Sequence, residues 1–434
     1  MIGFAILIAA FLGLMLLSIH VATAIFLVGW VGDATGAGIL GQMGGSINWS
    51  TMTDYVLVAI PLFIMVGEVL VRSGLTDKMY TALALWMNRL PGGLLHTNVA
   101  ACTLFSATSG SSVATAATIG TVALPSLRER GYSERLTVGS IAAGGTLGIL
   151  IPPSINMIIY AAMTDASIGR LFAAGVVPGI VLALIMSGII VVIALAKPSV
   201  EGRRDRNIPL MEKVRQLPHL LPVFLIFGII IGSIYTGMAT PTESGALALV
   251  ASLILAATTG RLSLSMLNDA ARATVRTTSM VVLILVAAFT LNFVLGFLGI
   301  PQELSAWVRD LGLSSHAMIW VIAIFYLVLG CFLEAVSMMV ITIGIVGPLA
   351  VSLGYDLVWF GIFMTLMMEL ALITPPNGLN LYVVQSIRDR GGSIMDVFIG
   401  VVPFVIAMML MVALLIYFPQ IALWLPDTLF GPST

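Results

Sequence analysis

The densest group of hydroxyl side chains in this sequence lies inside an apolar stretch. Residues 106–112 are Ser-Ala-Thr-Ser-Gly-Ser-Ser, and Thr115 follows closely. A few Ser and Thr residues in a membrane helix mean little, because their hydroxyls can bond back to helical carbonyls. A cluster this dense around Gly110 instead predicts a chain reversal with exposed carbonyls and amide ends, which can bind a cation or a carboxylate. Ser111, Ser112 and Thr115 are therefore candidate lining residues of a substrate cavity.

Two proline pairs interrupt other apolar stretches. The pairs at 152–153 and 375–376 are each followed by asparagine, namely Asn156, Asn377 and Asn380. Each proline removes an amide donor and breaks the helix, which frees carbonyl groups of the preceding turn. In a bilayer these carbonyls need partners, and either Na⁺ or neighbouring Ser and Asn side chains can supply them. The repetition favours a binding site, with Asn156 and Asn380 as candidate cavity residues.

Four glutamates lie within apolar runs, where a charge at mid-bilayer costs about 2.5–3.5 kcal/mol on insertion scales. They are Glu68, Glu243, Glu334 and Glu369. Glu243 ends a Thr-Pro-Thr-Glu sequence typical of a capping box, which predicts a structural role. Glu334 lies in a second polar stretch and is a candidate cavity residue. For Glu68 and Glu369, interhelical hydrogen bonding and ion binding are both open.

These polar groups belong to a chain that requires a membrane. Of its 434 residues, 59% are hydrophobic and 9% are charged, whereas soluble domains carry about 25% charged residues. The 19 basic residues balance the 20 acidic ones, which argues against a nucleic-acid-binding protein. The sequence contains no Walker motif, no HExxH motif and no Cys/His cluster. We therefore predict neither an enzyme nor a cofactor-binding protein.

Apolar runs long enough to cross a bilayer recur along the chain. They predict crossings at about residues 2–17, 20–32, 54–71, 136–163, 171–196, 218–236, 243–259, 277–299, 357–387 and 394–424. The stretches 94–126 and 317–350 are rich in Gly, Ser and Thr, and each can cross once or return as a hairpin. Short amphipathic segments at 76–90 and 301–311 precede them and are predicted to lie at the membrane interface.

Lys and Arg favour two hairpins. With 94–126 and 317–350 both returning, nearly all of the 19 basic residues lie on one face, which is then the cytoplasmic one. If either stretch crosses the membrane only once, every later residue changes face, and the basic residues no longer gather on one side. The sequence thus predicts an all-α polytopic membrane protein with about ten transmembrane helices, two re-entrant hairpins and a cytoplasmic basic linker at 197–217.

The two halves of the chain, 1–196 and 218–434, resemble each other at an offset of about 225 residues. The matched segments are 74–75 with 299–300, 118–120 with 342–344, 131–132 with 354–355, 152–153 with 375–376, 167–168 with 393–394, and 176–178 with 401–403. Because each half holds an odd number of predicted crossings, the repeats are predicted to have inverted topology. Such repeats are typical of alternating-access transporters, whose broken helices meet near the midplane.

Residues 109–115, the two proline-pair segments and residues 239–243 resemble the large membrane subunit of the TRAP (tripartite ATP-independent periplasmic) transporters. The resemblance covers essentially the whole chain. It implies a Na⁺-driven elevator in the bacterial inner membrane. The transporter is expected to use Na⁺ as the coupling ion and no organic cofactor. A small four-helix membrane subunit braces it, and a periplasmic binding protein delivers an organic acid. His20 departs from the pattern, because the family commonly has proline there.

The resemblance also implies two Na⁺ sites that use mainly backbone oxygens. Carried over by motif, the first falls on Ser106, Ser109, Gly148, Ile151 and Pro153. The second falls on Gly330, Ala371, Thr374 and Asn377. A single-component Na⁺/divalent-anion symporter of related architecture is the alternative, although its Ser-Asn-Thr hairpin motif is absent here. A channel or a membrane-embedded enzyme fits the sequence less well, because broken helices are mirrored and no nucleophile–base pair stands out.

Overall fold

The computed structural model describes residues 9–11, 13–15, 17–203, 209–388 and 392–432. Every regular element within these residues is a helix. The amino-terminal part contains α2 (Val21–Gly32), α3 (Leu40–Met52) and α4 (Ala59–Arg72). We expected only a connection where α3 lies. The helix forms there because Asp33 Oδ1 accepts hydrogen bonds from the amides of Ile39 (2.7 Å) and Leu40 (3.0 Å) at its start.

A helical hairpin occupies the first hydroxyl-rich stretch. After α5 (Leu75–Met87), the chain forms α6 (Leu94–Ser109), reverses, and returns as α7 (Ser112–Glu129). Gly110 makes the reversal in a left-handed conformation with φ of 60°, which glycine adopts without a Cβ penalty. The Ser111 hydroxyl accepts a hydrogen bond from the Ala114 amide (3.4 Å) and caps α7.

A helix interrupted by the first proline pair follows the hairpin. It consists of α8 (Glu134–Thr146), a 3₁₀ turn (Leu147–Ile149) and α9 (Ile155–Thr164), after which α10 (Ile168–Ala196) runs without interruption. The middle of the chain forms α11 (Leu210–Gln216), α12 (Leu221–Tyr235) and α13 (Pro241–Thr258). The predicted capping box at α13 is confirmed, because Glu243 accepts from the Thr240 amide at 2.8 Å while Thr240 caps the Glu243 amide at 3.3 Å.

The second half repeats this order of elements. It runs through α14 (Leu264–Phe297), α15 (Ile300–Asp310), α16 (Ser315–Gly330), α17 (Ala335–Ser352), α18 (Leu357–Ile373), α19 (Leu379–Ser386), α20 (Ile394–Tyr417) and α21 (Gln420–Phe430). Thus α16 and α17 form the second hairpin, and the second proline pair divides α18 from α19. Both proline pairs contain a cis peptide bond.

By length and composition, seven of the described helices can cross a membrane, and four more are apolar but shorter. Six of these seven correspond to predicted crossings, and the seventh, Ala335–Ser352, lies in the predicted second hairpin. The other four of the ten predicted crossings differ for physical reasons. Most of the 2–17 crossing lies outside the described residues, and α2 is short. The predicted crossings at 136–163 and 357–387 are each divided by a proline pair, so neither forms one long helix.

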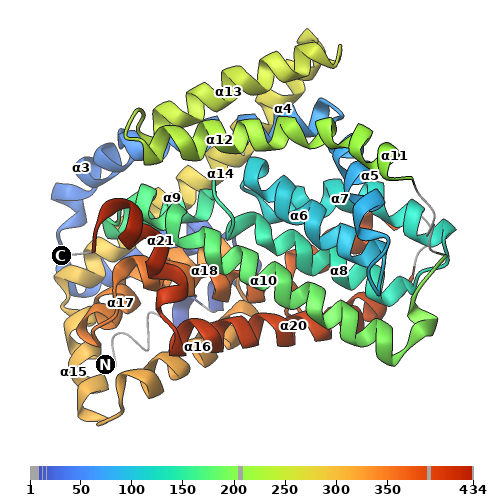
Figure 1. Cartoon of the computed structure of the whole chain (residues 1–434). Helices are drawn as coiled ribbons and strands as arrows, with labels where there is room; N and C mark the ends of the chain where they lie inside the picture. The colour runs from blue at the N-terminus through green and yellow to red at the C-terminus, as the bar shows by residue number, and fades with distance from the viewer. Residues whose placement is uncertain (1–8, 12, 16, 204–208, 389–391, 433–434) are drawn as a thin grey trace.

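The two halves pack reciprocally. α7 of the first hairpin packs against α19, and α17 of the second hairpin packs against α9. Likewise, α8 packs against α20, and α10 packs against α18. In Figure 1, α12 and α13 lie along one edge of the molecule and α20 along the opposite edge, with α6, α8 and α10 between them. Each half therefore completes the packing of the broken helix of the other half.

Two ion pairs also join the halves, at the start of α8. Arg388 contacts Glu134 at 2.7 Å, and Arg135 contacts Asp396 at 2.8 Å. The Arg388 side chain is only 3% exposed, and it also donates to the Gln385 side chain at 2.9 Å. These contacts connect the start of α8 to Arg388, just after α19, and to the first turn of α20.

Candidate functional site

The tip of the first hairpin lies directly on the first helix break. A Cβ atom added to Gly110 would lie 2.8 Å from the Pro153 carbonyl oxygen. One added to Gly148 would lie 2.8 Å from the Ser111 carbonyl oxygen. Glycine at both positions therefore lets the two backbones touch. The structure thus brings Gly148 and Pro153, two residues of the first predicted Na⁺ site, together with Ser111, a predicted cavity residue.

Hydroxyl groups around this tip donate to nearby carbonyls or to one another. Ser106 donates to the Cys102 carbonyl (2.5 Å), and Ser154 donates to the Ile149 carbonyl (2.6 Å). Ser109 and Thr115 share a hydrogen bond at 2.9 Å. Side-chain hydroxyls therefore satisfy some of the backbone carbonyl oxygens that the break leaves without amide donors. Each hydroxyl oxygen keeps lone pairs that can still coordinate a cation.

The second hairpin makes the equivalent approach to the second break. A Cβ atom added to Gly330 would lie 3.0 Å from the Ala371 Cα atom. Asn377 Nδ2 donates to the Phe332 carbonyl at 3.2 Å, which ties the loop after the break to the hairpin tip. Thr374 Oγ1 donates to the Leu370 carbonyl at 2.6 Å. All four residues predicted for the second site thus lie around one hairpin–break contact.

The two sites differ in burial. Ile151 is 6% exposed, and Pro153 and Ser109 are also buried. By contrast, Pro376 and Asn377 are exposed, and Thr374 is half-buried. The first site is therefore enclosed by protein, whereas the second reaches the surface of the described chain.

The remaining candidate cavity residues take several places. Glu334 begins α17 and accepts hydrogen bonds from the amides of Val336 and Ser337, both at 3.1 Å. Asn380 is buried and donates to the Ala142 carbonyl of α8 at 3.0 Å, so it joins the halves. Asn156 lies buried in the first turn of α9, and Ser112 lies buried at the start of α7. Glu334 therefore acts as a helix cap, and Asn380 as a link between α19 and α8.

The structure adds a buried polar chain that sequence reasoning missed. Tyr80 donates to Asn98 Oδ1 at 2.9 Å, and Asn98 Nδ2 donates to the Ser140 hydroxyl at 2.9 Å. These three residues connect α6, the first helix of the hairpin, to α5 and α8. Only their burial in three separate helices reveals the link, because no local sequence rule relates positions so far apart.

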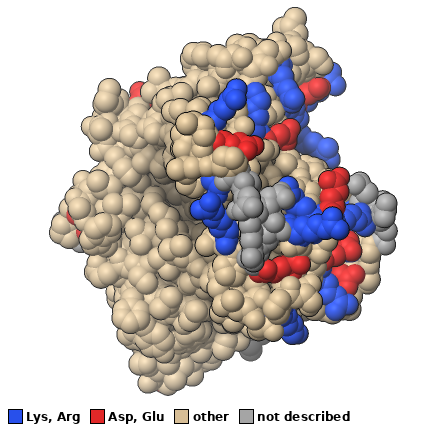
Figure 2. Space-filling model, turned by 45° about the vertical axis from the view of Figure 1, so that its right-hand side comes forward, with Lys and Arg blue, Asp and Glu red and all other residues tan. Residues whose placement is uncertain are grey.

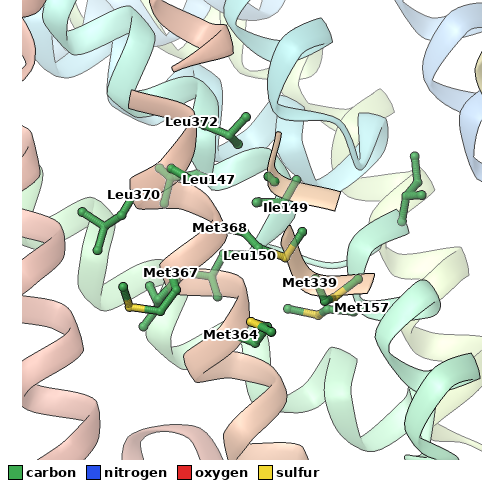
Figure 3. Close-up of a cluster of buried hydrophobic side chains, with 14 of the residues drawn as sticks. Leu147, Ile149, Leu150, Met157, Met339, Met364, Met367, Met368, Leu370 and Leu372 are labelled. Carbon is green, nitrogen blue, oxygen red and sulfur yellow. The ribbon is translucent and has the colours of Figure 1, made fainter. Parts of the chain in front are cut away.

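The sequence also leaves the environment of Glu369 open. It lies near the end of α18 and is fully buried. Figure 3 shows Met367, Met368 and Leu370, which adjoin it in sequence, in one apolar cluster with Leu147 and Leu150 of the first break. In contrast, Glu68 forms an ion pair with Arg72 on its own helix. This role differs from the two that the sequence left open, interhelical hydrogen bonding and ion binding.

No group of three or more His, Cys, Asp or Glu side chains within the described ranges can hold a metal ion. The oxygen atoms at the two hairpin–break contacts come instead from backbone carbonyls, hydroxyls and amides. Such ligands suit hard cations.

Comparison with known proteins finds matches to one family of membrane transporters. Residues 1–421 match the family model described as tripartite ATP-independent periplasmic transporter, DctM component. The C4-dicarboxylate TRAP transporter large permease protein DctM of Pseudomonas aeruginosa is 36% identical over 384 residues, covering 88% of each chain. The ectoine/5-hydroxyectoine TRAP transporter large permease protein UehC of Ruegeria pomeroyi is 30% identical, covering 86% of this chain and 87% of that one. The sialic acid TRAP transporter large permease protein SiaM of Vibrio cholerae is 29% identical, covering 90% and 89%.

Solved structures show the same fold at much lower identity. The Alcanivorax borkumensis YdaH transporter superimposes with a TM-score of 0.61 and 15% identity, over 91% of this chain and 90% of that one. Neisseria gonorrhoeae MtrF superimposes with a TM-score of 0.52 and 13% identity, over 89% and 85%. The family match over nearly the whole sequence, together with the mirrored hairpins and helix breaks, leads to one conclusion: this multi-pass membrane protein belongs to the TRAP transporter family, as a large permease (DctM) component.

Proposed function

We propose that this chain is the large permease subunit of a tripartite secondary transporter that uses a Na⁺ gradient to take up an organic acid. The observation that carries the proposal is the pair of hairpin tips, each placed on a proline-broken helix by glycine contacts at Gly110, Gly148 and Gly330. Broken helices of this kind present carbonyl oxygens to a cation and amide ends to an anion. Few carboxylates are placed for a proton relay, which favours Na⁺ over H⁺.

The substrate class follows from the hairpin chemistry and from the relatives. The relatives' names specify C4-dicarboxylates, sialic acid and ectoine, and each of these compounds carries a carboxylate. The first hairpin presents the start of α7 at its tip, capped by the Ser111 hydroxyl. A helix start beside hydroxyl groups favours a carboxylate without needing a basic side chain.

The mechanism we propose is an elevator. The two hairpins and the two broken helices pack reciprocally, so they can move as one body against α12, α13 and α14. A small four-helix membrane subunit braces this scaffold in the bacterial inner membrane. A periplasmic binding protein captures the substrate and delivers it to the external face.

Reconstitution into liposomes tests the proposal. The chain is inserted alone, with the small subunit, or with the small subunit and the binding protein. Uptake of a radiolabelled C4-dicarboxylate, sialic acid or ectoine is followed at fixed membrane potential without a pH gradient. We expect uptake only in the complete system and only with an inward Na⁺ gradient. Robust uptake by the chain alone would favour a single-component symporter, and uptake driven only by protons would refute Na⁺ coupling.

A further inference from the structure

Glu369 has an environment that a carboxylate cannot occupy without a partner. Its side chain is 0% exposed, and within the described part of the chain neither carboxylate oxygen accepts or donates a hydrogen bond. Residues Val358–Ile373 of the same helix are all buried. A charge in such a place is costly, and buried charged groups in membranes are typically paired or functional.

Glu369 also lies at the place where the broken helices of the two halves cross. Its helix, α18, packs against α8, α9 and the 3₁₀ turn Leu147–Ile149 of the first half. The side chains next to it in sequence pack with Leu147 and Leu150 (Figure 3). Glu369 is therefore a buried residue on a helix that packs against the elements of the first hairpin–break contact.

Charged groups on the surrounding helices are already engaged. On the helices packed against α18 these groups are Glu134 and Arg135 of α8, Arg170 of α10, His316 of α16, Asp396 of α20 and Asp427 of α21. Glu134 pairs with Arg388, Arg135 with Asp396, and Arg170 with Asp427. His316 stacks on Tyr417. Among the described residues, none of these groups forms an ion pair with Glu369.

A third buried oxygen without a partner lies on a neighbouring helix. Asn380 is fully buried on α19, which packs against both α18 and α8. Its Nδ2 atom donates to Ala142, but among the described residues its Oδ1 atom has no donor. Buried acceptor oxygens without donors are what a hard cation requires.

We propose that Glu369 binds Na⁺ through its carboxylate, at a site separate from the backbone-rich contacts of the two hairpin tips. Ala371, two residues later, directs its Cβ toward Gly330 of the second hairpin. Successive residues of a helix are about 100° apart, so Glu369 projects from a different face of α18. This inference rests on the proposed Na⁺ coupling. The site would supply a carboxylate ligand where the broken helices of the two halves cross.

The test uses the purified full-length chain and the complete reconstituted system. Glu369→Gln keeps the shape and removes the charge, and Glu369→Asp keeps the charge. Glu68→Gln is the matched control, because Glu68 is a glutamate on a membrane-spanning helix that already pairs with Arg72. Melting temperature and substrate uptake are measured from low to high NaCl, with choline chloride holding ionic strength constant.

We expect Glu369→Gln to raise the half-saturating Na⁺ concentration for uptake by at least about tenfold, since even outer partners of metal ligands change affinity 10- to 100-fold. Without Na⁺, this variant should melt close to the native chain, because a neutral amide of the same shape replaces a buried carboxyl group that has no partner. Its Na⁺-induced rise in melting temperature should shrink, since a ligand stabilises only the state that binds it. Glu369→Asp should retain part of the Na⁺ response, and Glu68→Gln should match the native response.

Three results would overturn the inference. A native-like Na⁺ response in Glu369→Gln would show that the carboxylate takes no part in cation binding, while leaving the proposed Na⁺ coupling intact. A Na⁺-independent loss of melting temperature in this variant, with unchanged half-saturation, would assign Glu369 a structural role. If the native chain itself ignores Na⁺ in both assays, the coupling proposal and this inference fail together.

Discussion

Thr374 shows how the two sites differ at the scale of single residues. Its hydroxyl donates to the Leu370 carbonyl, one turn back, at 2.6 Å. The equivalent residue in the first half is Ile151, which has no hydroxyl. The second break therefore satisfies one of its carbonyls with a side chain that can also offer an oxygen to a cation. The first break satisfies the Ile149 carbonyl through Ser154 instead.

Replacing Thr374 with valine keeps the shape and removes this hydroxyl. We expect the half-saturating Na⁺ concentration to rise, and we expect a loss of about 1–3 kcal/mol of stability, because the Leu370 carbonyl loses its donor. Thr374→Ser should restore both properties. Uptake at varied Na⁺ and melting temperature are the measurements. An unchanged Na⁺ dependence in the valine variant would mean that only backbone oxygens act at this site.

Local rules explain which residue-level features were predictable. The Ser106–Ser112 cluster, the proline pairs and the Glu243 capping box each act within a few positions, so their effects on the backbone could be predicted. Contacts such as Asn98 with Ser140, or Asn380 with Ala142, join helices distant in sequence. No residue pattern in one sequence specifies them.

At the scale of elements, the crossing of α8 and α20 depends on two glycines. A Cβ atom added to Gly139 would lie 3.0 Å from the Gly400 Cα atom, closer than ordinary packing allows. Small residues at such positions let membrane helices approach through their backbones. The sequence does not predict this contact, because each glycine lies in an ordinary apolar stretch and its packing partner is distant in the chain.

Gly139→Ala should separate α8 from α20. We expect a loss of about 1–3 kcal/mol from overpacking, which exceeds the gain of about 1 kcal/mol that alanine brings to a helix. Gly188→Ala on α10 is the control, since its added Cβ meets no atom within 4 Å. Melting temperatures in detergent compare the two variants. Equal melting temperatures would show that the crossing tolerates a wider spacing.

At the scale of the whole molecule, the charged residues are distributed unevenly. Figure 2 shows that most Lys, Arg, Asp and Glu side chains on the visible face gather in one region, and that the rest of this face is largely free of charge. The sequence predicts that the basic linker at 197–217 is cytoplasmic, since such loops carry an excess of Lys and Arg. The sequence matches predict inverted repeats, but they do not predict the reciprocal packing of the two halves, because that packing depends on the three-dimensional fold.

Cysteine labelling tests this orientation. Ser199→Cys and Ser315→Cys are introduced separately into a chain without Cys102 and Cys331, and intact cells are treated with an impermeant thiol reagent. We expect Ser315→Cys to react and Ser199→Cys to react only after the cells are permeabilised. Labelling of Ser199→Cys alone in intact cells would reverse the orientation.

The reciprocal packing of α7 with α19 and of α17 with α9 also has a consequence for biosynthesis. The partners that complete the first half are translated only after the basic linker and most of the second half have been made. At about 5–20 residues per second, the first half waits on the order of ten seconds or more for them. During that interval α7 and α9 stand in the bilayer without α19 and α17, so lipids, the insertion machinery or chaperones must shield these helices until the second half has been made.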